Sequence, residues 1–104
     1  MKYYNKAIRD KIPEIIRNSG SKPNVKSLSD DEFQIELENK LKEELEEYFE
    51  NKKIEELGDI IDVIERIVDL KGISSAEFEK NRLKKIATNG KFEKNLFLID
   101  VENN

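Results

Sequence analysis

The sequence predicts an all-α domain, in which antiparallel helical hairpins form a four-helix-bundle core that dimerisation completes. Apolar residues recur at helical spacing over two long segments, and capping signals precede two of the expected helices. A very short turn joins the two longest helices, which must then lie antiparallel. One such hairpin cannot bury both of its apolar stripes, so we expect a second copy to cover them. A length of 104 residues suits one domain, spanning residues 1–104.

A short helix is expected close to the N-terminus. Asp10 is placed to cap it, Pro13 is tolerated within its first turn, and Gly20 would end it. Residues 3–7 are expected to be extended, and a loop rich in Ser, Gly, Pro and Asn follows the helix. Four isoleucines carry the helical spacing: Ile8, Ile12, Ile15 and Ile16.

Two long helices form the centre of the prediction. The first opens with a capping box at Ser29 and Glu32, and a turn at residues 51–53 separates it from the second. The second ends near Gly72. The apolar stripe of the first consists of Phe33, Leu37, Leu41, Leu45, Tyr48 and Phe49. The stripe of the second consists of Ile54, Leu57, Ile60, Ile61, Ile64, Ile67 and Val68.

The C-terminal part of the chain predicts one more helix and a strand. Ser74 and Glu77 form a second capping box, and Asn89-Gly90 ends the helix. Residues 95–101 are β-branched and aromatic enough to predict a short strand. Short extended segments are therefore expected at both termini.

The residue types that are missing exclude several kinds of chemistry. The chain has no Cys, His or Trp, which excludes disulfides, cysteine zinc sites and a Ser-His-Asp triad. A catalytic site would consist of carboxylates, Lys, Arg, Tyr or hydroxyl groups, and carboxylates favour Mg²⁺ or Mn²⁺. The net charge of -4 does not favour a nucleic-acid polymer as partner. No apolar run approaches a membrane span or a signal-peptide core, so we expect a cytoplasmic protein without membrane contact.

Four carboxylates stand beside the apolar stripes of the two long helices. At about 100° per residue, Glu44 falls inside the first stripe and Glu47 just off its edge. On the next helix Glu56 falls inside the apolar arc and Asp59 just past its margin. An antiparallel hairpin brings the two pairs together, where a divalent cation would relieve their repulsion. The competing interpretation is a solvated acidic face with Glu–Lys pairs such as Lys42–Glu46, since the chain has 23 acidic residues.

The same residues resemble a known family. Glu43-Glu44-Leu45-Glu46-Glu47 and Glu56-Leu57-Gly58-Asp59 are similar to the EExxE…ExxD signature of the all-α nucleotide pyrophosphohydrolases, which include MazG-like and phosphoribosyl-ATP pyrophosphohydrolase-like proteins. Residues 4–16 resemble the NKLVRDKIPEII start of a small single-domain branch, and residues 90–98 its RGGFEKRIFL-like ending. The likeness spans nearly the whole chain, although Asn89 and Lys91 replace the Arg and the second Gly of that ending.

The resemblance implies a helical-bundle homodimer or homotetramer that hydrolyses a nucleoside triphosphate to the monophosphate and pyrophosphate, including the clearance of non-standard nucleotides. It implies Mg²⁺, with Mn²⁺ as an alternative, held by Glu44, Glu47, Glu56 and Asp59. Glu43 would orient the attacking water, a role that Glu47 shares. Basic residues expected to meet the phosphates are Lys40, Arg9, Lys11, Lys84, Lys85 and Lys94.

Two other functions remain open from the sequence. A non-catalytic helical adaptor would use the same hairpin to dimerise or to bind a partner. A nucleotide sensor would keep the metal site but release no pyrophosphate. The resemblance favours the enzyme over both.

Overall fold

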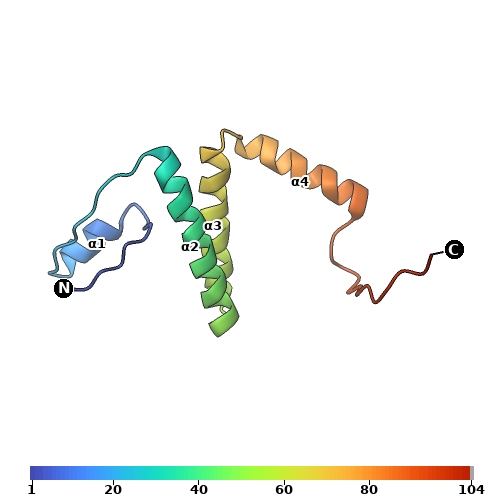
Figure 1. Ribbon diagram of the computed structural model, residues 1–104, viewed down its shortest axis with the longest axis horizontal. Coiled ribbons are helices and arrows are strands. Elements are labelled where there is room, and N and C mark those ends of the chain that lie inside the picture. Colours follow the sequence, from blue (N-terminus) through green and yellow to red (C-terminus); the bar gives the residue numbers. More distant parts are fainter. Residues whose placement is uncertain (104) are drawn as a thin grey trace.

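The computed structural model describes residues 1–103, and within them the chain is all-α, with no strand. This confirms the predicted class. None of its helices is long and apolar enough to cross a membrane, within the same residues. The four helices are α1 (Ile12–Asn18), α2 (Asp30–Asn51), α3 (Ile54–Leu70) and α4 (Ser75–Asn89) (Figure 1).

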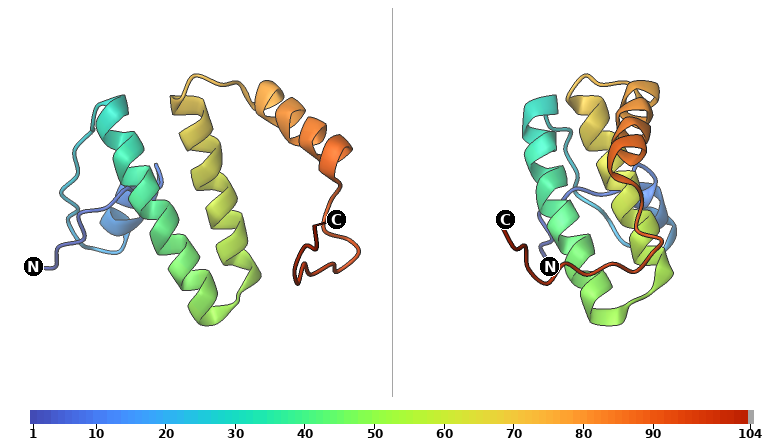
Figure 2. Two further views of the ribbon diagram at one scale, coloured as in Figure 1. Left: turned by 45° about the vertical axis from the view of Figure 1, so that its right-hand side comes forward. Right: turned by 90° about the vertical axis from the view of Figure 1, so that its right-hand side faces the viewer.

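The helices α2 and α3 form the predicted antiparallel hairpin (Figure 2). The capping box is present at the start of α2: the Ser29 hydroxyl accepts from the Glu32 backbone N–H at 3.2 Å, and the Glu32 carboxylate accepts from the Ser29 backbone N–H at 3.2 Å. The turn is tight because Lys52 adopts the left-handed conformation with φ 58°, so α3 begins only two residues later. These caps confirm the predicted bounds of the hairpin.

The core is small and involves the N-terminal segment. Only Ala7, Leu37 and Val63 are buried hydrophobic residues among those described. Leu37 comes from α2 and Val63 from α3, whereas Ala7 precedes α1, so the N-terminal segment packs against the hairpin. The partly buried side chains around this core are Phe33, Leu41, Ile67 and Leu70.

The first helix is shorter than the isoleucine spacing suggested. It begins at Ile12, and Lys11 is the N-cap residue without a side-chain cap hydrogen bond, so the predicted cap at Asp10 is wrong. Pro13 lies in the first turn and has no N–H, which leaves fewer free donors for a cap to satisfy. Gly20, with φ 95°, follows the end of the helix as predicted.

The predicted strand at residues 95–101 is wrong. This segment is irregular, and its side chains are exposed, with Leu96 at 87% and Ile99 at 85%. A strand needs a neighbouring strand to satisfy its backbone hydrogen bonds, and residues 1–103 supply none. The preceding helix has the predicted bounds: the Ser74 hydroxyl caps α4 by accepting from the Glu77 N–H at 3.1 Å, and Gly90 ends it. The predicted capping box is only half formed, because among the described residues the Glu77 carboxylate does not accept from the Ser74 N–H.

The single chain does not build a compact bundle. The fourth helix meets α3 near the turn between them and then runs away from the hairpin (Figure 1). The radius of gyration is 18.7 Å, whereas a compact domain of this length has about 13 Å. The accessible surface is 9689 Å², against about 6,100 Å² for a compact monomer of this mass. The chain therefore exposes about 3,600 Å² more than a compact monomer, and several large apolar side chains contribute to that excess.

Candidate metal centre

The carboxylates singled out by helical spacing lie where the two long helices face each other near their connecting turn. Glu44 is 6% exposed and is the one buried charged residue among those described. Its place inside the apolar stripe of α2 explains this burial. Glu43, Glu47, Glu56 and Asp59 are half-buried around it.

The hairpin brings these carboxylates into two groups that share Glu44. Oxygens of Glu43, Glu44 and Glu47 lie within 4.8 Å of one another on α2. Oxygens of Glu44, Glu56 and Asp59 lie within 4.8 Å of one another across α2 and α3. The tight turn at Lys52 is what places the first residues of α3 opposite the last turns of α2. The arrangement can therefore present oxygens from two helices to one or two cations.

Two buried oxygens in this cluster have no hydrogen-bond partner. The Glu44 Oε1 atom lies 3.3 Å from the Lys40 Nζ atom, whereas the Oε2 atom is unpartnered. The Glu56 Oε1 atom accepts from the Asn51 amide at 3.3 Å, and its Oε2 atom is likewise unpartnered. A buried acceptor without a partner costs about 1–3 kcal/mol. A hard cation satisfies such oxygens, so the donor set fits Mg²⁺ or Mn²⁺.

Electrostatic coupling within the cluster shifts its pKa values in opposite directions. The pKa of Glu47 is raised to about 7, because its carboxyl group shares a hydrogen bond with Glu56, is partly desolvated and faces the charge of Glu44. The pKa of Glu56 is lowered, chiefly because its carboxylate accepts the hydrogen bond from Asn51. One proton is thus held by Glu47 near neutral pH, as expected for crowded carboxylates.

Basic residues of the N-terminal segment and of α2 pair with the edges of the cluster. The Lys6 Nζ atom lies 2.8 Å from Glu43, and the hydrogen bond between them lowers the pKa of Glu43. Lys40 lies 3.5 Å from Glu43 as well as 3.3 Å from Glu44. The Lys6–Glu43 contact and the burial of Ala7 hold the N-terminal segment against the hairpin, whereas the Lys40 contacts lie within α2.

Arg9 fastens the same segment to α3. Its guanidinium lies 2.8 Å from Asp59 and 2.9 Å from Asp62. Arg9 and Lys40, two of the cations predicted to meet phosphate, are therefore next to the carboxylate cluster and already paired with it.

The other predicted phosphate-binding cations lie elsewhere. Lys11 is exposed at the start of α1. Lys84 and Lys85 are on α4, and Lys94 is in the segment that follows α4. The helix α4 and this following segment run away from the hairpin (Figure 1). The structure does not bring these four lysines to the carboxylate cluster of the same chain.

Two paired residues escaped the sequence reasoning. Lys6 reaches Glu43 from an irregular segment, in which Lys6 lies at a bend and Asn5 has a φ of 46°, so residues 3–7 are not extended as expected. Helical periodicity makes no prediction for such a segment. Helical spacing places Asp62 on the side of its helix away from the apolar arc, where a solvated charge is expected, yet it binds Arg9. One feature of the sequence indicates these ion pairs: a short basic run, containing Lys6, Arg9 and Lys11, precedes an acid-rich hairpin.

Comparison with known proteins adds little to this geometry. No protein-family model matches the chain, and no solved structure matches it. An uncharacterized protein from Mycolicibacterium smegmatis (strain ATCC 700084 / mc(2)155) is 52% identical over 40 residues, which cover 38% of this chain and 41% of that protein. The chain thus matches less than half of that relative's length.

Proposed function

We propose that the protein is a Mg²⁺-dependent nucleoside triphosphate pyrophosphohydrolase, which converts a nucleoside triphosphate to the monophosphate and pyrophosphate. The observation that carries this proposal is Glu44, a carboxylate 6% exposed with an unpartnered oxygen, inside a cluster drawn from two facing helices. An ordinary solvated acidic face has no reason to bury such a group. The order of the EExxE, ExxD and terminal motifs supports the same reaction.

Glu44, Glu47, Glu56 and Asp59 would hold one or two cations, with Glu44 shared between the group on α2 and the group that joins α2 to α3. Bound there, Mg²⁺ would neutralise phosphate charge and make a water molecule more acidic. Lys6 and Lys40 hold the Glu43 carboxylate from two sides, so it stays ionised and can accept a hydrogen bond from the attacking water. A Glu47 oxygen that is not engaged by the cation would accept the proton that this water loses when its oxygen bonds to phosphorus and pyrophosphate departs.

The proposal includes a homodimer or homotetramer in which two hairpins complete a four-helix bundle. Large apolar side chains near the turn of the hairpin are exposed in the single chain, with Ile54 at 74%, Phe49 at 65% and Leu45 at 38%. Side chains of this size are seldom left in water as a group. A second hairpin packed on this face would cover them and further shield the carboxylate cluster from solvent.

The decisive experiment measures pyrophosphate release from a panel of standard and modified triphosphates, with Mg²⁺ or Mn²⁺. Asp59→Asn should abolish turnover, whereas Asp62→Asn is the matched control, because each removes a carboxylate paired with Arg9 but only Asp59 belongs to the cluster. Equal turnover in both variants would refute the metal assignment. Tight nucleotide binding without pyrophosphate would indicate a sensor, and calorimetry without site-specific Mn²⁺ binding would indicate an adaptor.

A further inference from the structure

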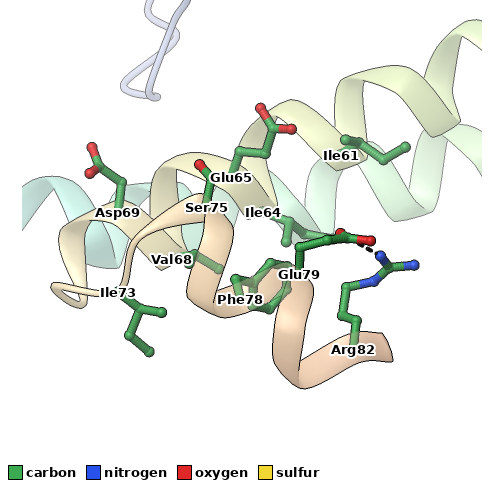
Figure 3. Close-up of a pocket in the computed structure, with 10 residues that line it drawn as sticks. All are labelled: Ile61, Ile64, Glu65, Val68, Asp69, Ile73, Ser75, Phe78, Glu79 and Arg82. Atoms are coloured by element: carbon green, nitrogen blue, oxygen red, sulfur yellow. Dashed lines mark hydrogen bonds and ion pairs between the residues drawn. The ribbon is translucent and has the colours of Figure 1, made fainter. Parts of the chain in front are cut away.

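An open apolar groove separates α3 from the start of α4, away from the carboxylate cluster (Figure 3). Its volume is about 400 Å³. Acidic side chains line its rim, namely Glu65, Asp69 and Glu79, and Glu79 is paired with Arg82 at 2.7 Å. Its apolar lining consists of Ile61, Ile64, Val68, Ile73 and Phe78.

The same chain carries an apolar segment that has nothing to pack against. Residues 91–101, here named the C-terminal tail, follow α4. Six large apolar side chains of this tail are between 72% and 101% exposed: Phe92, Leu96, Phe97, Leu98, Ile99 and Val101. Gly90, with φ 84°, turns the chain at the end of α4, so the tail leaves from the far end of that helix (Figure 1). The groove lies at the opposite end of α4, and the tail of the same chain does not enter it.

Charge favours contact between the tail and the groove. Three acidic side chains line the groove together with Arg82. Asp69 is paired with Arg66 and Glu79 with Arg82, and Glu65 is the third acidic side chain. The tail begins with Lys91 and Lys94 on either side of Glu93, and Glu93 lies 3.8 Å from Lys91, whereas Asp100 stands near the other end of the tail. Lys94 at the start of the apolar tail can therefore pair with Glu65 beside the apolar groove.

The exposed area is sufficient for a stable contact. The chain exposes about 3,600 Å² more than a compact monomer of its mass, and a standard interface buries about 800 Å² per partner. Phe92 and Phe97 alone would contribute about 300–500 Å². An exchange in which each copy supplies one tail and one groove is self-complementary and closes at two copies.

We propose that the C-terminal tail of a second copy of this chain docks in the groove between α3 and α4, and that the two copies exchange tails reciprocally. This surface is separate from the face near the hairpin turn, which the proposed bundle would cover. The exchange requires neither a metal ion nor catalysis, so it stands or fails independently of the proposed reaction.

Cross-linking tests the exchange directly, because the chain has no cysteine of its own. A tagged Phe97→Cys chain is mixed with an untagged Val68→Cys chain, and the mixture is oxidised. The proposal expects a covalent heterodimer on a denaturing gel. In the control, a Val25→Cys chain replaces the Val68→Cys chain; Val25 is 54% exposed and lies on another segment. The heterodimer should be at least tenfold more abundant with Val68→Cys than with this control. A yield no higher than the control would overturn the proposal. So would a double Val68→Cys/Phe97→Cys chain that closes only within itself.

Charge reversal tests the recognition. Lys91→Glu/Lys94→Glu should weaken dimerisation at least tenfold by sedimentation velocity, and Glu65→Lys/Asp69→Lys should do the same. Mixing these two variants should restore a heterodimer, since the reversed tail meets a reversed groove. The control, Lys22→Glu/Lys26→Glu, makes the same charge change in the loop before α2 and should leave dimerisation unchanged. A tail variant that dimerises as tightly as the parent, or a mixture that gains nothing, would contradict the proposal.

Discussion

Replacing Glu44 with glutamine should abolish metal binding and leave the fold intact. The substitution keeps the size of the side chain and an oxygen that can accept the contact from Lys40, now 3.3 Å away. It removes a buried negative charge whose second oxygen has no partner. We therefore expect the metal-free variant to be within about 1 kcal/mol of the parent, because the lost ion pair is offset by the lost cost of burying charge.

The magnitude comes from linkage between metal binding and unfolding. A cation at ~100 times its Kd stabilises the folded state by about 2.7 kcal/mol. For a domain of this size each kcal/mol raises the Tm by about 4–8 °C, so the parent should gain about 10–20 °C. The Glu44→Gln variant loses the carboxylate shared by both groups and should gain almost nothing.

The assay is thermal unfolding followed by circular dichroism, with and without Mn²⁺ or Mg²⁺. Glu50→Gln is the matched control, because it removes an exposed carboxylate from the same helix and should keep the full shift in Tm. A Glu44→Gln protein that retains the parent's metal-induced shift would refute the reasoning. The carboxylate cluster would then be an acidic surface without a specific cation.

The remaining predictions concern pH, the N-terminal segment, the core and a cap. The pKa of Glu47 is about 7 in the folded protein and 4.5 ordinarily, so between these pH values the folded protein keeps a proton that the unfolded chain has lost. The free energy of unfolding of the metal-free protein should therefore fall as pH rises from 4.5 to 7. Glu47→Gln should flatten this slope in urea titrations. Lys6→Met removes the 2.8 Å contact to Glu43 and should lower kcat more than it changes KM, whereas Lys6→Arg should preserve kcat. Leu37→Ala opens the small core, and urea unfolding should show a loss of about 2–5 kcal/mol. Ser29→Ala removes the cap of α2, and the same measurement should show a loss of about 1 kcal/mol.

Each of these predictions can fail in its own way. A pH slope unchanged in Glu47→Gln would mean that another group holds the proton. If Lys6→Met leaves turnover unchanged, the contact between Lys6 and Glu43 has only a structural role, which is to hold the N-terminal segment on the hairpin. A Leu37→Ala protein as stable as the parent would show that the core lies mainly between copies. Equal stability of the Ser29→Ala variant would indicate that α2 starts without its cap.

Rules that act over a few residues were sufficient to predict the long helices and the positions of the carboxylates along them. The capping box at Ser29 and the glycines after α3 and α4 act within a few residues, so the bounds of α2, α3 and α4 follow from the sequence. The 3.6-residue period also placed Glu44 inside an apolar stripe, and the structure buries it. Where capping is weak, as at Lys11, or where an element needs a distant partner, as at residues 95–101, the same rules failed.

The sequence by itself thus determined the class, the central hairpin and the identity of the acidic cluster, because these depend on spacing along a helix. Only the tertiary structure decided that Lys6 and Arg9 bind the cluster, that Ala7 joins the core, and that α4 leaves the hairpin. The contact between Arg9 and Asp59, for example, joins residues 50 positions apart along the chain. The formation of such contacts depends on how loops close and which surfaces meet, and no local period encodes that.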